Sequence, residues 1–456
     1  MKVCTITRCQ TKAWLECAHK VRKRVFKKLE SQGLITNYNR LRKNLPSKLP
    51  KRVFIWDETL MEGEQALTVF LTYVEKVKLA KMMDEMGIAI ITVGFPAVSK
   101  EEKLAVRRIS NEEFQQATIA APARIVRSDI DTCLECGVKE ISIFTQFNGL
   151  NLRHRLKMTK EQVLEKTVDC IEYTKKHGVT VDFVLEDASR TPIQDILRIF
   201  EAAVKAGADR LVIADTVGFL RPLSMRYLVS HVRGGLFQAI GREVPLSVHC
   251  HNDFGLATAN TLAAVEEGVA YPHTCIAGFG RRAGVAPLEE VATALELLYR
   301  IDTGVNMKKL HRLSQLAEKC FATPIPFHKP IVGENAFSHG SEAHAHSMLT
   351  QPLLDEPFPP KIVGRESQFY LGKMLEKPLV EDLLTLAGIR ASSKQIEEII
   401  RRIRRMQEKL DKGEVQMIFY QIKKLTREMQ KGLTEEHFWK IVEKVTGQKP
   451  KLSSIS

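Results

Sequence analysis

The stretch VTVDFVLEDASRTPIQDILRIFEAAVKAGADRLVIA, residues 179–214, contains one complete strand–helix–strand unit. A β-branched run at 179–184 is followed by an amphipathic run at 195–206, and Gly207 ends the helical pattern before the apolar run at 211–214. Strands that are joined by helices pair in parallel through crossover connections. This unit therefore predicts a parallel sheet whose faces are covered by helices.

The same alternation continues from residue 53 to about residue 305. Amphipathic runs such as 76–86 and 160–177 separate eight apolar runs, which are predicted to be strands at 54–56, 89–93, 117–121, 141–144, 179–184, 211–214, 246–248 and 274–277. Eight strand–helix units in roughly 240 residues predict an α/β fold of the (β/α)8 TIM-barrel type. The alternative is a doubly wound sheet, but no GxGxxG motif follows the first strand.

Composition divides the chain into four predicted parts. Residues 1–52 form a basic N-terminal extension, 53–305 the barrel domain, 306–365 a linker and lid subdomain, and 366–456 a helical C-terminal domain. The extension holds 15 Lys and Arg against 2 acids, whereas the rest of the chain holds 53 against 52. The net charge of +14 therefore says little about what the barrel binds.

The extension is interpreted as a solvated arm, with a targeting peptide or a contact with RNA or anionic lipid as alternatives. Nucleic-acid binding is expected nowhere else in the chain. No apolar run is long enough to predict a membrane span. The nine cysteines follow no disulfide pattern, which indicates a reducing, cytoplasmic compartment, with organelle targeting by residues 1–52 left open.

Two histidines one residue apart stand at the end of the predicted seventh strand, in the segment Val248-His249-Cys250-His251-Asn252-Asp253. Alternate side chains of a strand share a face, so His249 and His251 project together and Cys250 points away. The acid-rich segment 57–65, DETLMEGEQ, follows the first strand and offers a carboxylate as a further ligand. Because TIM-barrel chemistry lies at the carboxyl ends of the strands, these segments predict a metal site. A pair of hydrogen-bonded core histidines is the alternative.

These segments resemble the homocitrate synthase and 2-isopropylmalate synthase family of metal-dependent Claisen-condensing enzymes, over roughly residues 52–390. The resemblance rests on DETLMEGEQ at 57–65 against the family's DTTLREGEQ, EDASR at 186–190 against EDATR, ADTVG at 214–218, HCHND at 249–253 against HxHND, and the lid segment GENAFSH at 333–339.

The resemblance implies an enzyme that joins the α-carbon of acetyl-CoA, or of another acyl-CoA, to the carbonyl of a 2-oxo acid. It implies that Glu62, His249 and His251 bind a divalent metal (Mg, Mn or Zn), which acts as a Lewis acid. The residues that it assigns to substrate binding are Gln65, Arg190, Thr216 and Asn252. Glu186 would shape the acyl-CoA pocket, and His344 would transfer a proton, from the neighbouring subunit of a homodimer.

The chain departs from the family motifs at charged positions. Met61 stands where the motif has an arginine that stabilises the enolate, and the family's GxGERxGN reads GFGRRAGV at 278–285. Arg281 thus replaces a glutamate, and Val285 replaces an asparagine that is a metal ligand in some members. The family's SDxH segment after the fourth strand is also replaced, by QFNG at 146–149.

The first and eighth strands of a closed barrel are neighbours, which suggests a way to keep the enzyme active. We expect Arg281 to take over the charge role of the missing arginine, because positive charge at a developing oxyanion lowers the barrier to enolate formation. Contacts of Arg281 and Arg282 with CoA phosphates are a simpler interpretation. A carbon–carbon lyase or aldolase on the same metal barrel, and a degenerate barrel without catalysis, remain alternative functions; Met61 favours the latter.

Overall fold

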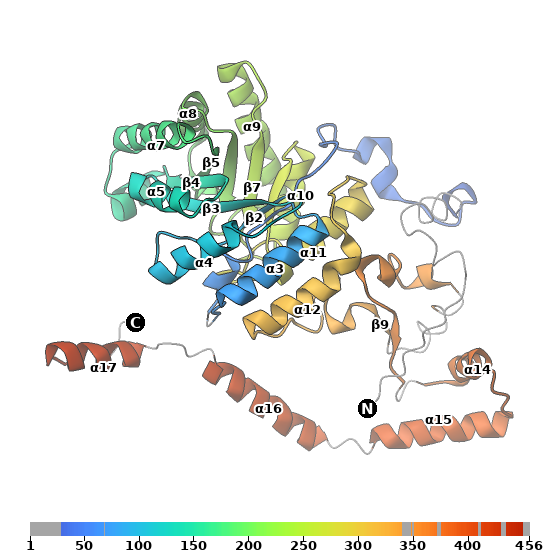
Figure 1. Cartoon of the computed structure of the whole chain (residues 1–456). Helices are drawn as coiled ribbons and strands as arrows, with labels where there is room; N and C mark the ends of the chain where they lie inside the picture. The colour runs from blue at the N-terminus through green and yellow to red at the C-terminus, as the bar shows by residue number, and fades with distance from the viewer. Residues whose placement is uncertain are drawn as a thin grey trace. The chain divides into compact units, whose positions relative to one another are not determined.

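The computed structural model describes residues 29–67, 69–339, 348, 351–371, 375–408, 412–429 and 435–449. The chain divides into two compact units, Met1–Tyr370 and Leu371–Ser456. The first unit contains the barrel, and the described part of the second is helical (Figure 1). The narrower domain boundaries that composition suggested stay predictions.

Eight parallel strands close into a barrel in the order β1-β2-β3-β4-β5-β6-β7-β8, which confirms the predicted TIM-barrel fold. The first seven predicted runs each overlap an observed strand. The strands are β1 Trp56–Asp57, β2 Ile90–Thr92, β3 Thr118–Arg124, β4 Glu140–Gln146, β5 Thr180–Glu186, β6 Arg210–Asp215, β7 Leu246–Cys250 and β8 Tyr271–Thr274.

The predicted position of the eighth strand was wrong by three residues. The structure has β8 at 271–274, and the apolar run that was taken for the strand, 274–277, mostly follows it as a turn. Ala277 adopts a left-handed φ of 54°, which ends the extended conformation. Cys275 instead pairs its backbone with Ala286 and Leu288, so this apolar run packs against the next loop rather than against a strand.

Helices surround the barrel because each has one apolar face (Figure 1). In α8 the buried residues Ile196, Ile199, Phe200 and Ala203 recur every three or four positions, and Phe200 packs edge-on against Phe183 of β5. The helices of the first unit are α3 Tyr73–Met86, α4 Lys100–Ser110, α5 Arg127–Glu135, α6 Gly149–Asn151, α7 Lys160–Lys175, α8 Ile193–Lys205, α9 Pro222–Ile240, α10 Ala257–Glu266, α11 Leu288–Ala294 and α12 Leu310–Phe321.

The interior of the barrel is closed at the amino ends of its strands by a charged floor. Arg210 at the start of β6 forms ion pairs with Asp182 (Nε to Oδ1, 2.7 Å) and with Glu140. Its guanidinium also lies over the rings of Trp56 and Tyr271, at 5.3 and 4.8 Å from their centroids. The remaining space inside the barrel therefore opens toward the carboxyl ends, where TIM barrels carry their chemistry.

A short parallel sheet of β9 Ser338–His339 and β10 Gln368–Phe369 lies near the end of the first unit. The helices of the second unit are α14 Lys377–Leu386, α15 Ser393–Glu408, α16 Lys412–Met429 and α17 Glu435–Thr446. Among the described residues, no helix combines the length and the apolar character needed to cross a bilayer.

Candidate metal and active site

A cavity of about 560 Å³ lies at the carboxyl ends of the barrel strands. Its wall includes Glu62 and Met61 from the turn after β1, Glu186 from β5, and His249 and His251 from β7 and its end. The sequence segments that were predicted to meet at this edge of the barrel therefore do meet there.

Glu62, His249 and His251 lie close enough to share one ion, with one potential ligand atom from each lying within 4.8 Å of the others. Nε2 of His249 lies 3.3 Å from Nε2 of His251, and Oε1 of Glu62 lies 3.8 Å from Nε2 of His251. All three side chains are buried. The expected convergence is present, whereas the ligand role of these residues stays a prediction.

The donor atoms of this cluster fit a divalent cation. Oε1 of Glu62 is buried and has no hydrogen-bond partner among the described residues. Nε2 of His249 and Nε2 of His251 face each other at 3.3 Å, so two lone pairs at this distance need one proton or one cation between them. Two histidines and one carboxylate suit a first-row divalent metal and leave coordination positions open for a substrate.

The electrostatics of Glu62 and His251 differ. Burial raises the pKa of Glu62, although His249 and Arg281 oppose the shift. Burial lowers the pKa of His251 to about 2, and the neighbouring His249 and Arg281 add to this shift. His251 therefore stays neutral and keeps an imidazole lone pair free for a metal at all ordinary pH values.

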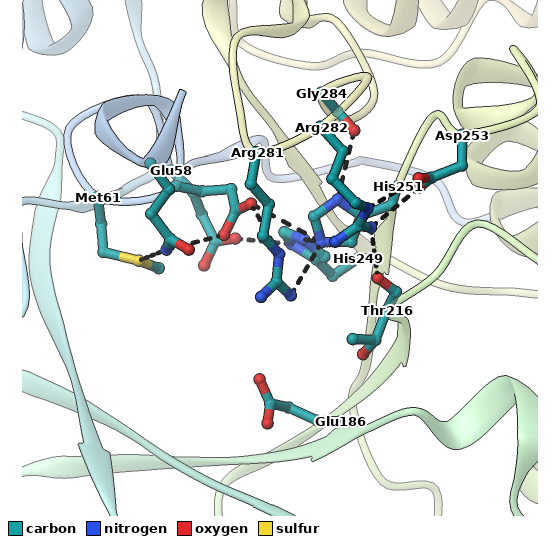
Figure 2. Close-up of polar contacts among 12 residues, drawn as sticks. Glu58, Met61, Glu186, Thr216, His249, His251, Asp253, Arg281, Arg282 and Gly284 are labelled. Atoms are coloured by element: carbon teal, nitrogen blue, oxygen red, sulfur yellow. Dashed lines mark hydrogen bonds and ion pairs between the residues drawn. The ribbon is translucent and has the colours of Figure 1, made fainter. Parts of the chain in front are cut away.

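Glu58 and His273 are two further buried residues of the cavity wall, and neither was among the predicted site residues. Oε2 of Glu58 lies 2.7 Å from Nδ1 of His249 and 3.3 Å from Nδ1 of His273. Although burial acts in the opposite direction, the two histidines hold the pKa of Glu58 well below its usual range. Glu58 is therefore an anion in contact with one of the predicted metal ligands (Figure 2).

Arg281 reaches into the cavity from the loop after β8. Its Nε lies 3.6 Å from Oε1 of Glu62, and one of its terminal nitrogens lies 3.4 Å from Nε2 of His251. Figure 2 shows the guanidinium facing the same open space as the carboxylate of Glu186. Met61 lines the same cavity, and its sulfur lies 3.3 Å from Nε2 of Gln65.

The conformation of the loop that carries Arg281 depends on two glycines. Gly278 and Gly284 have φ values of 74° and 83°, in the left-handed region that favours glycine. A Cβ atom on Gly284 would collide with the carbonyl oxygen of Gly278. The Gly284 carbonyl also lies 3.3 Å from Nδ1 of His251, so the loop contacts a predicted ligand directly.

Three more predicted site residues line the cavity: Gln65, Glu186 and Thr216. Nε2 of Gln65 donates to Oε2 of Glu62 at 3.1 Å. Burial raises the pKa of Glu186, whose Oε2 has no hydrogen-bond partner within the described chain and lies 3.6 Å from Arg155. Arg155, from a turn after β4, is a cationic cavity residue that sequence reasoning missed.

The other predicted site residues lie elsewhere. Arg190 is exposed and forms a two-pronged pair with Asp187 (2.7 and 2.8 Å) beside the cavity rather than in its wall. The side chain of Asn252 accepts from the backbone of Ala257 at the start of α10. His344 lies outside the described residues. The substrate contacts of Arg190 and Asn252, the role of His344 and the homodimer stay predictions.

Comparison with known families agrees with this arrangement. A family model described as HMGL-like matches residues 52–317, which is more than half of the chain. The chain belongs to the HMGL-like family. A second model, described as homocitrate synthase post-HMGL domain-like, matches residues 331–411 of this family member.

The curated relatives of this HMGL-like chain include several synthases. It is 41% identical over 361 residues to the probable 2-isopropylmalate synthase of Methanopyrus kandleri, covering 79% of this chain and 71% of that protein. It is 38% identical over 400 residues to a homocitrate synthase of Methanothermobacter thermautotrophicus, covering 88% of this chain and 95% of that protein. A putative (R)-citramalate synthase of M. kandleri is 40% identical over 363 residues.

Among solved structures, the hydroxymethylglutaryl-CoA lyase of Pseudomonas aeruginosa superimposes with a TM-score of 0.54. The alignment covers 61% of this chain and 96% of the lyase, at 22% sequence identity. At that level of identity the likeness concerns the fold alone. The synthases are the relatives that share extensive sequence with this chain.

Proposed function

We propose that this chain is a divalent-metal-dependent acyltransferase that condenses acetyl-CoA, or another acyl-CoA, with a 2-oxo acid. The cluster of Glu62, His249 and His251 in the wall of the barrel cavity is the observation that carries this proposal. Relatives that are about 40% identical to this chain are named as a 2-isopropylmalate synthase and a homocitrate synthase. Both names describe enzymes that form a product of such a condensation.

The reaction balances as follows. A base removes a proton from the α-carbon of the thioester, and the resulting enolate forms a carbon–carbon bond with the keto carbon of the 2-oxo acid. The carbonyl π bond opens as this bond forms, and the former keto oxygen takes up a proton to become a hydroxyl group. Water then cleaves the thioester, which releases CoA as a free thiol. Two steps need protein groups: stabilisation of the enolate oxygen and removal of the α-proton.

A divalent cation held by Glu62, His249 and His251 would supply Lewis acidity for the keto carbonyl. The open side of the cluster faces the cavity, so a 2-oxo acid can approach it there. Thr216 and Gln65 line the same space and are proposed to orient the acid. We retain Mg, Mn and Zn as candidates, because a mixed nitrogen and oxygen donor set accepts each of them.

We propose that Arg281 stabilises the enolate oxygen, because it is a cation whose side chain lies in the cavity beside the metal cluster. Among the described residues, Glu186 is the group that we propose to accept the α-proton of the thioester. Its raised pKa makes the ionised carboxylate a stronger base than an exposed glutamate, and it faces the same space as Arg281. His344 is proposed to act in proton transfer as well.

The experiment is an assay of CoA thiol release. Purified full-length protein with Mg²⁺ or Mn²⁺ is given acetyl-CoA and each of five 2-oxo acids in turn: 2-oxoglutarate, 2-oxoisovalerate, pyruvate, oxaloacetate and glyoxylate. We expect one acid to stimulate release, and we expect His251→Ala to abolish that stimulation. His231→Ala, which alters an exposed histidine on α9, is the matched control.

Thiol release that does not depend on a 2-oxo acid would indicate simple thioester hydrolysis and would contradict the proposal. No release with any acid, although Mn²⁺ binds to the wild-type protein, would favour a lyase or a barrel without catalysis.

A further inference from the structure

The carboxylate of Glu58 lies between two buried histidines at the bottom of the cavity. Its Oε2 is 2.7 Å from Nδ1 of His249, a hydrogen-bond distance, and 3.3 Å from Nδ1 of His273. Glu58 is 7% exposed and His273 is 3% exposed, so water competes little for these contacts. Glu58 directly follows β1, and its backbone N–H donates to the carbonyl of Thr274 in β8 at 2.8 Å.

The contact with Glu58 determines which nitrogen of His249 is available to a metal. When Nδ1 donates its proton to a carboxylate, Nε2 carries the lone pair. Nε2 is the nitrogen that lies 3.3 Å from His251 and belongs to the Glu62 cluster. A carboxylate that holds a metal-binding imidazole in this way fixes the ring and increases its basicity as a ligand.

We propose that Glu58 is a positioning residue of the metal site, which orients His249 through Nδ1. This inference rests on the proposed function, since it assumes a metal at Glu62, His249 and His251. It adds a residue to that site.

The test measures Mn²⁺ binding by isothermal titration calorimetry on the full-length protein. Loss of a carboxylate behind a metal-binding histidine typically weakens metal binding about 10- to 100-fold, and we expect a loss in this range for Glu58→Thr. Glu58→Gln keeps the shape and an acceptor oxygen but loses the charge, so we expect a smaller loss. Glu165→Thr, an exposed position on α7, is the matched control.

The outcomes distinguish this inference from the proposed function. If the wild-type protein binds no Mn²⁺ and shows no CoA release with any divalent metal, the proposed function itself fails. If the wild-type protein binds Mn²⁺ and both Glu58 variants bind it equally well, the positioning role fails and the metal site stands. Circular dichroism and the thermal midpoint identify a variant that has lost its fold, and Glu58→Gln keeps the test valid if Glu58→Thr unfolds.

Discussion

The guanidinium of Arg281 lies beside the carboxylate of Glu62, with Nε 3.6 Å from Oε1, although the two residues belong to loops at opposite ends of the barrel sequence. Closure of the barrel brings these loops together, because β1 pairs with β8. A positive charge therefore lies next to the metal cluster in a chain that has methionine at position 61. This relationship leads to the first prediction.

Replacing Arg281 with alanine should lower the rate of CoA release at least about 100-fold, since one donor at an oxyanion site is commonly worth this much. Arg281→Lys should recover part of the loss, because it keeps the charge without the planar guanidinium. The measurement is the thiol-release assay at saturating substrate. Arg226→Ala, which removes a cation paired with Glu267 away from the cavity, serves as the control. Full turnover by Arg281→Ala would exclude the proposed enolate role.

Replacing Gly284 with alanine should distort the loop that carries Arg281. The new Cβ would collide with the Gly278 carbonyl oxygen at a left-handed φ, and we expect a loss of about 1–3 kcal/mol in the free energy of unfolding. We also expect weaker Mn²⁺ binding, because the Gly284 carbonyl contacts His251.

Gly178 provides the matched control for that variant. It has a similar φ of 73°, but nothing lies within 4 Å of an added Cβ. Gly178→Ala should therefore show only the cost of the left-handed backbone and should leave Mn²⁺ affinity unchanged. Urea denaturation and calorimetry measure the two effects, and equal losses for both glycines would contradict the predicted collision.

Lys76 should be essential for stability although it lies on a surface helix. Its ammonium group is buried and pairs at 2.7 Å with both Glu64 and Glu102, which line the cavity. Lys76→Met would leave these two carboxylates without their common partner, which typically costs about 3–5 kcal/mol. Lys78→Met, an exposed position on the same helix, should change the free energy of unfolding by much less. Similar urea midpoints for the two variants would contradict this prediction.

Glu289 should make stability depend on pH. Burial raises the pKa of this carboxyl to about 7, while its Oε2 accepts from the backbone of Ala277 at 3.0 Å. Between pH 4.5 and 7 the folded state keeps a proton that the unfolded chain releases, so Glu289 lowers the free energy of unfolding as pH rises through this window.

Comparison with Glu289→Gln isolates this contribution. The wild-type free energy of unfolding, relative to that of the variant, should fall by on the order of 3 kcal/mol between pH 4.5 and pH 8, since each pKa unit is worth about 1.4 kcal/mol. Urea titrations at several pH values measure it. A constant difference would mean that Glu289 titrates normally.

Much of the barrel was predictable because its strands are apolar runs in a regular alternation with amphipathic helices. β8 was the exception: its residues Tyr271, Pro272 and His273 do not resemble a buried strand, whereas the apolar turn that follows does. That error hid His273, whose side chain points into the cavity.

The convergence of His249, His251 and Glu62 could be predicted. The two histidines alternate at the end of one strand, and Glu62 lies in the acid-rich segment after the first strand, at the same edge of the barrel. Glu58 was missed because four acids lie between residues 57 and 64, and the sequence alone does not show which of them contacts a histidine. Its position directly after the first strand was a signal that could have found it, because TIM-barrel chemistry lies at the carboxyl ends of the strands. Its contact with His249 depends on the three-dimensional closeness of β1 and β7, which local sequence does not encode.

The ion pairs of Arg210 with Asp182 and Glu140 lie across the amino ends of the strands, so the cavity opens only at the carboxyl ends of the described barrel. Molecules that react in the cavity must enter and leave through the same mouth, so the substrate that sits deepest has to arrive first. In the proposed reaction this substrate is the 2-oxo acid at the metal, and the bulky acyl-CoA then covers it. We therefore expect an order of addition in which the acid binds first, because acyl-CoA that arrived early would block the path of its own acceptor.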